Sequence, residues 1–191
     1  MPDEASAAAS KVTLHMVASL DGIIARPDNS VSWFAAAESP YPAGATLSEE
    51  EIGAFLKSID CYLLGSRTYQ HAIELGWPYG DTPTAVLTTR SLTSSRQNVE
   101  FHSGDAKTIL AEKLAPRFRN IWLVGGASLA QRFLELGLVD EISLTIAPIL
   151  LGEGLRLFGT LAQEQLWSLK KAVAYRNGFV ELSYAVRREK A

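Results

Sequence analysis

The sequence predicts an α/β domain in which helices cover a mostly parallel sheet that ends in antiparallel strands. Segments typical of strands and of helices alternate up to Gly137, which favours parallel strands joined by helical connections. Beyond that point, two strand-like runs flank Asn177-Gly178, a dipeptide typical of a two-residue hairpin loop. The chain is therefore expected to form one domain over residues 11–191, preceded by a loose tail at 1–10.

The first elements are a strand and a long loop. Apolar and polar residues alternate over 12–18, which predicts a strand, and Asp21-Gly22 has the turn chemistry that ends it. Residues 26–47 are rich in proline and turn formers, and they predict a long loop of the kind that is usually functional.

A helix is predicted to begin after Ser48. Ser48 and Glu51, three residues apart, fit a capping box. The apolar residues that follow recur at helical spacing and predict one buried face, made of Ile52, Phe55, Leu56 and Ile59.

The middle of the chain repeats the order of strand and then helix. Further strands are predicted at 61–64, 84–89, 98–101 and 121–124. Further helices are predicted at 68–75, from Asp105 to the residue before Pro116, and from Gly125-Gly126 to Gly137. The last strands are predicted at Glu141–Ile149, Leu169–Tyr175 and Phe179–Arg187.

Composition narrows the class of protein. The chain has 191 residues, 47% hydrophobic residues and a net charge of −3, so it can bury a core and lacks the basic face of a nucleic-acid-binding protein. No segment is typical of a signal peptide or a membrane span, which predicts a soluble, cytoplasmic protein. Cys61 is the sole cysteine, so an intramolecular disulfide and a thiolate-rich zinc site are excluded.

Polar, phosphate-compatible segments follow three predicted strands. Gly125-Gly126 joins a strand to a helix, where free N–H groups and close backbone approach suit an anion, although a tight turn without a ligand fits equally well. Arg67 follows the strand at 61–64, and Arg90 follows the strand at 84–89. Each arginine alone is more typical of a solvated surface, but parallel strands bring their carboxyl ends to one edge of a sheet.

The ordered set of these segments resembles the dihydrofolate-reductase-like superfamily, in particular the branch that includes the reductase domain of bacterial riboflavin biosynthesis. The resemblance covers residues 11–187 and rests on Ser19–Ala25, Leu64–Tyr69, Ala85–Arg90, Trp122–Ala127, and Leu138–Glu141 leading to Ile146–Gly152. It implies the three-layer fold of that superfamily and an NADPH-dependent reductase. The substrate implied is a small heterocycle, as for the reductase of 5-amino-6-(5-phosphoribosylamino)uracil.

The resemblance also implies where NADPH would bind. Residues 65–68 match a segment that holds the adenine-side phosphates, and 88–90 match one near the 2′-phosphate. Residues 124–129 match a segment around the pyrophosphate and nicotinamide, often with a cis peptide between the two glycines. The strand at 15–18 and the loop at 22–25 would flank the nicotinamide. The cofactor-binding residues predicted in this way are Val17, Ala18, Ile24, Gly65, Ser66, Arg67, Thr68, Leu87, Thr88, Thr89, Arg90, Val124, Gly125, Gly126, Ala127, Ser128 and Leu129.

The resemblance leaves the catalytic acid open. Counting back from Gly65 favours Glu49, whereas the apolar helix face favours Glu51, and an acidic first turn that complements the helix dipole explains both equally well. Asp21 matches a frequent acid of the family, but it could simply cap the turn with Gly22.

The substrate half of the chain departs from the riboflavin reductase pattern. Val124 stands where those enzymes usually carry an acid, and 71–80 lacks their Asp-Asp-Pro segment. Trp33, Trp77 and Tyr79 are candidates for the substrate pocket, with core packing as the alternative. A reductase of pterins or other carbonyl compounds, and an NADP-binding protein without turnover, are therefore alternative functions. By analogy with the riboflavin-type relatives, we expect a homodimer formed through the antiparallel end of the sheet.

Overall fold

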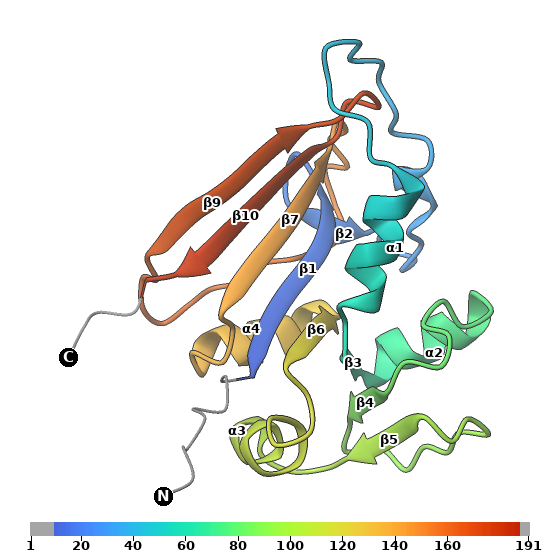
Figure 1. Ribbon diagram of the computed structural model, residues 1–191, viewed down its shortest axis with the longest axis vertical. Helices are drawn as coiled ribbons and strands as arrows, with labels where there is room; N and C mark the ends of the chain where they lie inside the picture. The colour runs from blue at the N-terminus through green and yellow to red at the C-terminus, as the bar shows by residue number, and fades with distance from the viewer. Residues whose placement is uncertain (1–9, 188–191) are drawn as a thin grey trace, which may run out of the picture.

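The computed structural model describes residues 10–187, so almost all of the predicted tail at 1–10 lies outside the described residues. One eight-stranded sheet has the order β5-β4-β3-β6-β1-β7-β10-β9 (Figure 1). Its strands are β1 (Lys11–Ser19), β3 (Cys61–Gly65), β4 (Thr84–Leu87), β5 (Val99–His102), β6 (Asn120–Gly125), β7 (Glu141–Ala147), β9 (Trp167–Ala174) and β10 (Val180–Val186). The pairs from β5 to β7 are parallel and β10 is antiparallel to both neighbours, which confirms the predicted fold class.

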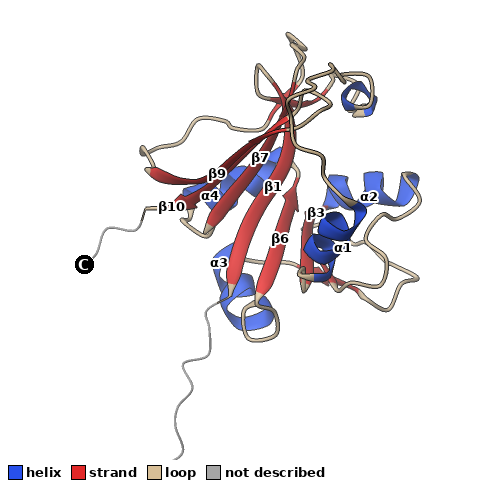
Figure 2. Ribbon diagram, turned by 45° about the horizontal axis from the view of Figure 1, so that its top comes forward, coloured by secondary structure: helices blue, strands red, loops and turns tan. Residues whose placement is uncertain are grey.

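Helices lie on both faces of this sheet and make the three layers (Figures 1 and 2). They are α1 (Glu49–Lys57), α2 (Ser66–Glu74), α3 (Ala106–Ile109), which continues into a π-helical turn (Leu110–Leu114), and α4 (Ala127–Glu135). Apolar side chains of α3 and α4 pack with alternate residues of the central strands, such as Leu14, Leu63 and Leu123, in the main core. On the opposite face, α2 packs Tyr69 and Ala72 in a smaller cluster.

The helix predicted after Ser48 forms with its capping box. The Ser48 side chain accepts a hydrogen bond from the Glu51 backbone N–H, and the Glu51 carboxylate accepts one from the Ser48 backbone N–H. The predicted buried face is wrong for most of its members: Ile52, Phe55 and Leu56 are 41%, 41% and 44% exposed. They face an open cleft, so the apolar period of α1 marks the wall of a cavity and not a core contact.

The C-terminal hairpin forms as predicted, but its loop is longer. Val180 pairs with Ala174, and the Gly178 N–H donates to the Tyr175 carbonyl in a turn closed at Phe179. Gly178 has φ +83°, which places it in the left-handed region after the turn, as in a three-residue loop with a bulge. The predicted two-residue loop is therefore wrong, because Asn177-Gly178 occupies the last two positions of the turn.

A short second sheet ties down the loop after β1. β2 (Ile23–Ala25) pairs antiparallel with β8 (Leu155–Arg156), a pairing that sequence periodicity did not predict. At the other end of the main sheet, β9 is an edge strand that carries Lys170 and Lys171 and exposes Leu169. The expected homodimer through this edge stays a prediction. No helix in the described part of the chain is long and apolar enough to cross a membrane.

Candidate functional site

Three segments that are distant in sequence meet at the carboxyl edge of the parallel strands. β4, β3 and β6 are neighbours in the sheet, and their register pairs Gly65 with Leu87 and Leu64 with Gly125. The residues that follow these strands therefore lie side by side. This is the edge at which open α/β sheets bind their ligands.

Two helices begin at this edge without a side-chain cap. For both α2 and α4 the N-cap residue is a glycine, Gly65 and Gly126, and neither N-terminus receives a side-chain hydrogen bond. By contrast, α1 is capped by Ser48 and α3 by Asp105, both away from this edge. Uncapped N–H groups carry partial positive charge and need an acceptor. The edge therefore offers two converging sets of backbone donors to an anion.

The glycines at the edge lie where the starts of α2 and α4 approach each other. A Cβ on Gly126 would lie 3.3 Å from Thr68 Oγ1, and a Cβ on Gly65 would lie 3.7 Å from the Gly125 carbonyl oxygen. Gly125 has φ +96°, which favours glycine, and the Gly125-Gly126 peptide bond is cis, as the resemblance implies. The starts of α2 and α4 are thus in contact.

The segment after β4 contacts the same helix. The Arg90 backbone N–H donates to Thr88 Oγ1 over 2.9 Å, and the Arg90 guanidinium donates to Gln70 Oε1 on α2 over 3.4 Å. Arg67, in the first turn of α2, and Arg90 are both exposed. Thr89 is exposed beside Arg90, and Leu87 and Thr88 are half-buried. This part of the edge therefore presents two exposed guanidinium groups, and Arg90 could exchange its long hydrogen bond with Gln70 for a phosphate.

The end of β1 lies beside the start of α4. Ala18 and Ile24 are buried in one cluster with Leu157, and Ala127 packs against it. Val17 points to the other side of the sheet, where it packs against the cluster of Trp33. Of the remaining residues of the α4 segment, Ser128 is exposed, whereas Val124 and Leu129 are half-buried against the two core clusters.

Asp21 fastens this region to the loop after β7. Its carboxylate accepts hydrogen bonds from Ser19 Oγ at 2.5 Å and from the backbone N–H groups of Leu151 at 3.1 Å and Gly152 at 2.7 Å. The Ser19 hydroxyl contributes most to lowering the pKa of Asp21 to about 2, with the two N–H groups adding to it. Because the carboxyl group is ionised at neutral pH and bonded to the backbone at 151–152, the structure favours a role in joining these two loops over the predicted role as proton donor, and the alternative of capping the turn at Gly22 is not what the carboxylate does.

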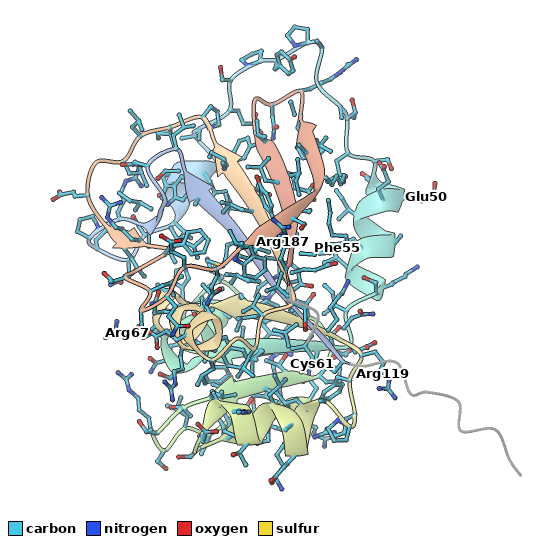
Figure 3. All side chains as sticks on the ribbon, turned by 90° about the vertical axis from the view of Figure 1, so that its left-hand side faces the viewer. Glu50, Phe55, Cys61, Arg67, Arg119 and Arg187 are labelled. Carbon is cyan, nitrogen blue, oxygen red and sulfur yellow. The ribbon has the colours of Figure 1, made fainter. Side chains whose placement is uncertain are left out.

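A cleft of about 1010 Å³ opens between α1 and the sheet. Phe55 projects from α1 toward the sheet, whereas Glu50 on the same helix points away from it (Figure 3). On the viewer's side of Figure 1, no helix covers β7, β10 and β9, so these strands form an open wall of the cleft. The polar residues of that wall alternate along the strands and include Ser143, Thr145, Glu181 and Ser183.

His15 lies in the floor of this cleft. Its ring stacks on Trp122, with centroids 4.8 Å apart, and tilts against Phe55 at 5.1 Å. Its Nδ1 atom is buried and has no hydrogen-bond partner among the described residues. Burial lowers the pKa of His15, and the negative charge of Glu181 partly opposes that shift. A neutral imidazole ring therefore lines the cleft.

Glu181 forms the centre of a hydrogen-bonded group on the opposite wall. The Tyr175 hydroxyl donates a short hydrogen bond to Glu181 Oε2, and Lys171 Nζ lies 3.8 Å from the same oxygen. Ser143 Oγ and Ser183 Oγ lie 3.5 Å and 3.4 Å from Glu181 Oε1. Burial, followed by the hydrogen bond to Glu181, raises the pKa of Tyr175, so its hydroxyl stays protonated.

The two glutamates predicted on α1 differ in position. Glu51 lines the cleft, but its carboxylate is held by the capping box, and hydrogen bonds from Ser48 lower its pKa. Glu49 is exposed in the first turn and is not among the described residues that line the cleft. Of the two candidates for the catalytic acid, only Glu51 therefore lies at the cleft, and its capping hydrogen bonds leave its carboxylate only partly available to a ligand.

None of the aromatic residues predicted to bind substrate is among the described residues that line this cleft. Trp33 is 1% exposed and packs behind Phe179, and Trp77 is 7% exposed with its Nε1 donating to the Gly80 carbonyl. Tyr79 is half-buried and contacts Tyr62, which in turn contacts Trp122. Core packing thus accounts for the two tryptophans. Tyr79 does not line the cleft and is connected to it only by the contacts of Tyr62 with Trp122.

Sequence reasoning missed His15, Tyr175 and Glu181 as members of the cleft. A signal was present, because Glu141, Ser143 and Thr145 on β7, and Glu181 and Ser183 on β10, alternate with apolar residues. An alternating polar face is equally typical of a strand face in contact with water. The alternation alone could not distinguish a ligand-facing wall from a solvated one.

Comparison with known proteins gives a family model and a relative that match most of the chain's folded part. The model of the RibD C-terminal domain family matches residues 77–180. The uncharacterized protein YwjB of Bacillus subtilis (strain 168) is 32% identical over 162 residues, which cover 84% of this chain and 89% of YwjB.

Two solved structures extend the comparison. A candidate riboflavin biosynthesis protein from Shewanella sp. PV-4 superposes with a TM-score of 0.80 at 26% identity, covering 93% of this chain and 99% of that one. Dihydrofolate reductase from Enterococcus faecalis, in complex with NADP(H), shares the fold at 15% identity, with a TM-score of 0.62 over 93% of this chain and 97% of that one.

Proposed function

The chain belongs to the RibD C-terminal domain family, and on that premise we propose that it is a reductase that binds NADPH and transfers hydride to a small heterocyclic substrate. The observation that carries the proposal is the meeting of three strand ends at one edge. Two uncapped helices begin there beside two exposed arginines.

The residues at the edge suit a dinucleotide. Backbone N–H groups at the starts of α2 and α4 are directed donors for phosphate oxygens, and the glycines keep that surface free of side chains. Arg67 and Arg90 add guanidinium groups, whose fork geometry binds phosphate with two hydrogen bonds. A phosphate monoester beside either arginine would distinguish NADPH from NADH.

The cofactor supplies the hydride, so the chain's task is to bind, orient and exclude water. Ala18 and Ile24 present a buried apolar surface at the end of β1, next to the start of α4. The cleft opens on the other face of the same strand, where His15 lies between residues of β6 and β7. A nicotinamide ring at the end of β1 would therefore meet a substrate around the carboxyl edge of the sheet.

The cleft has the chemistry of a substrate site. Its volume is in the range of pockets that bind small molecules, and it combines apolar rings from α1 and β6 with a polar wall from β7 and β10. His15 is the titratable group on its floor. Burial holds this imidazole neutral near pH 7, so it orients a substrate through hydrogen bonds without adding a charge.

A steady-state assay tests the proposal. Oxidation of NADPH is followed with a pyrimidine, a pterin and a quinone as acceptors, and cofactor binding is measured separately by calorimetry. We expect NADPH to bind and at least one heterocycle to be reduced. Binding without oxidation would instead favour an NADP-binding protein without turnover, an alternative supported by Val124 standing where riboflavin reductases carry an acid. Failure to bind NADPH would reject both functions.

A further inference from the structure

We propose that Glu181 on β10, and not an acidic residue of α1, is the carboxylate that binds the substrate, and that it selects planar heterocycles with adjacent N–H donors. The inference rests on the proposed function, because it assigns a substrate-binding residue within the reductase cleft. It concerns a wall of the cleft that the cofactor edge does not include.

Three carboxylates line the cleft in the described part of the chain, and they differ in how short the contacts of their oxygens are. Glu51 accepts hydrogen bonds from the backbone N–H and the hydroxyl of Ser48, at 2.9 and 2.8 Å. Glu141 forms ion pairs with Lys11 at 3.1 Å and with Lys170 at 2.5 Å. Glu181 is the third.

Glu181 is fixed in place yet keeps acceptor capacity. Its side chain is 19% exposed, so it is largely withdrawn from water. The Tyr175 hydroxyl donates to Oε2, and Lys171 Nζ lies 3.8 Å from the same oxygen. The contacts of Oε1 with Ser143 and Ser183 are 3.5 and 3.4 Å long, at the limit of a hydrogen bond. A carboxylate has about four acceptor sites, so the Oε1 side can accept N–H groups from a ligand.

The surroundings of Glu181 favour a flat, hydrogen-bonding ligand. Thr145 lies directly opposite Glu181 in the β7–β10 register, and Ser143 lies opposite His15 in the β1–β7 register. His15 and Glu181 therefore belong to neighbouring rows of side chains, and Ser143, whose Oγ lies 3.5 Å from Glu181 Oε1, connects the two rows diagonally. Across the cleft, Phe55 on α1 provides a ring that a heterocycle can stack on.

The side chains around Glu181 set the polarity of the ligand. The carboxylate accepts hydrogen bonds, and the hydroxyls of Ser143, Thr145 and Ser183 can donate or accept them. An aminopyrimidine or aminopteridine ring presents N–H donors beside ring nitrogens, and these donors match the acceptors on Glu181. A ring without N–H donors would displace water from Oε1 without replacing its hydrogen bonds, which is costly in a partly buried site.

The experiment uses 2,4-diaminopyrimidine and unsubstituted pyrimidine as probes, titrated by ligand-observed NMR against the full chain without NADPH. We expect wild type to bind the diamino compound at least ~10-fold more tightly than pyrimidine, since charge-assisted hydrogen bonds are the stronger ones. Glu181→Gln should abolish that preference, and Glu181→Asp, which retains the charge, should restore part of it. Glu50→Gln is the matched control, because Glu50 points away from the cleft (Figure 3), and it should keep the preference.

Several results would overturn the assignment. These are a wild-type protein that does not prefer the diamino probe, a Glu181→Gln variant that keeps the preference, and a Glu51→Gln variant that loses it. Melting temperatures show whether each variant is folded. If Glu181→Gln does not fold, Glu181→Asp still tests the assignment, because a shifted carboxylate should reduce the preference for the diamino probe. Because no NADPH is present, the outcome is independent of cofactor binding, and failure of the reductase proposal remains a separate result.

Discussion

Replacing Gly154 by alanine should disrupt the short β2–β8 sheet that holds the loop after β1. Gly154 has φ +141°, and a Cβ there would lie 2.2 Å from the Ala25 carbonyl oxygen and 2.8 Å from Ile23 Cγ2. Both neighbours belong to β2, so relief of the clash requires β2 and β8 to separate. A strained backbone costs about 1–3 kcal/mol, and overpacking adds about 1–3 kcal/mol. The free energy of unfolding should therefore fall by about 2–6 kcal/mol.

Gly152→Ala provides the matched control. Gly152 also has a positive φ, +79°, but no atom lies within 4 Å of its hypothetical Cβ. Only the backbone conformation is penalised, at about 1–2 kcal/mol. Urea unfolding followed by circular dichroism measures both variants. The reasoning is refuted if Gly154→Ala is no more destabilising than Gly152→Ala, because the close contact with β2 would then carry no energy.

The remaining predictions concern charge. Arg67→Ala or Arg90→Ala should weaken the binding of NADPH by roughly 10- to 100-fold, which is the loss expected for one charge-assisted phosphate contact. The same variants should weaken the binding of NADH far less. Calorimetry with both cofactors checks this, and equal losses would remove the 2′-phosphate role from the residue changed. Burial lowers the pKa of His15 in the folded state. The stability that the neutral ring contributes is therefore present above the unfolded pKa of about 6.5 and is lost as the pH falls toward the folded pKa. His15→Gln should reduce the fall in the free energy of unfolding between neutral and mildly acidic pH, as measured by urea unfolding at several pH values. An unchanged pH dependence would contradict the burial of a neutral ring.

The sequence predicted the sheet and the meeting of three strand ends at one edge well because both depend on local signals. Alternation in β1, the apolar run before Gly65 and the glycines after β6 each have a short-range cause. Once the strands are parallel, the meeting of their carboxyl ends follows from topology. The predicted cofactor residues themselves stay predictions until a nucleotide is bound.

The substrate side was predicted poorly because it depends on long-range packing. The apolar period of α1 is the same for a helix on a core and for one above a cleft, and only the tertiary structure shows that Phe55 is exposed. Trp33 is an aromatic residue in a long loop, which suggested ligand binding, but it is buried in a cluster with Phe179. Glu181 acquires its significance from Tyr175 at the far side of the hairpin, a contact that strand periodicity does not encode.

The central claim is that one edge of the sheet holds a phosphorylated nicotinamide carrier. A crystal structure of the protein soaked with NADPH tests it most directly. We expect the pyrophosphate between the starts of α2 and α4, beside Gly65 and Gly126, and the 2′-phosphate within hydrogen-bonding distance of Arg67 or Arg90. Density for the cofactor on another face of the molecule, or a ribose phosphate remote from both arginines, would contradict the account.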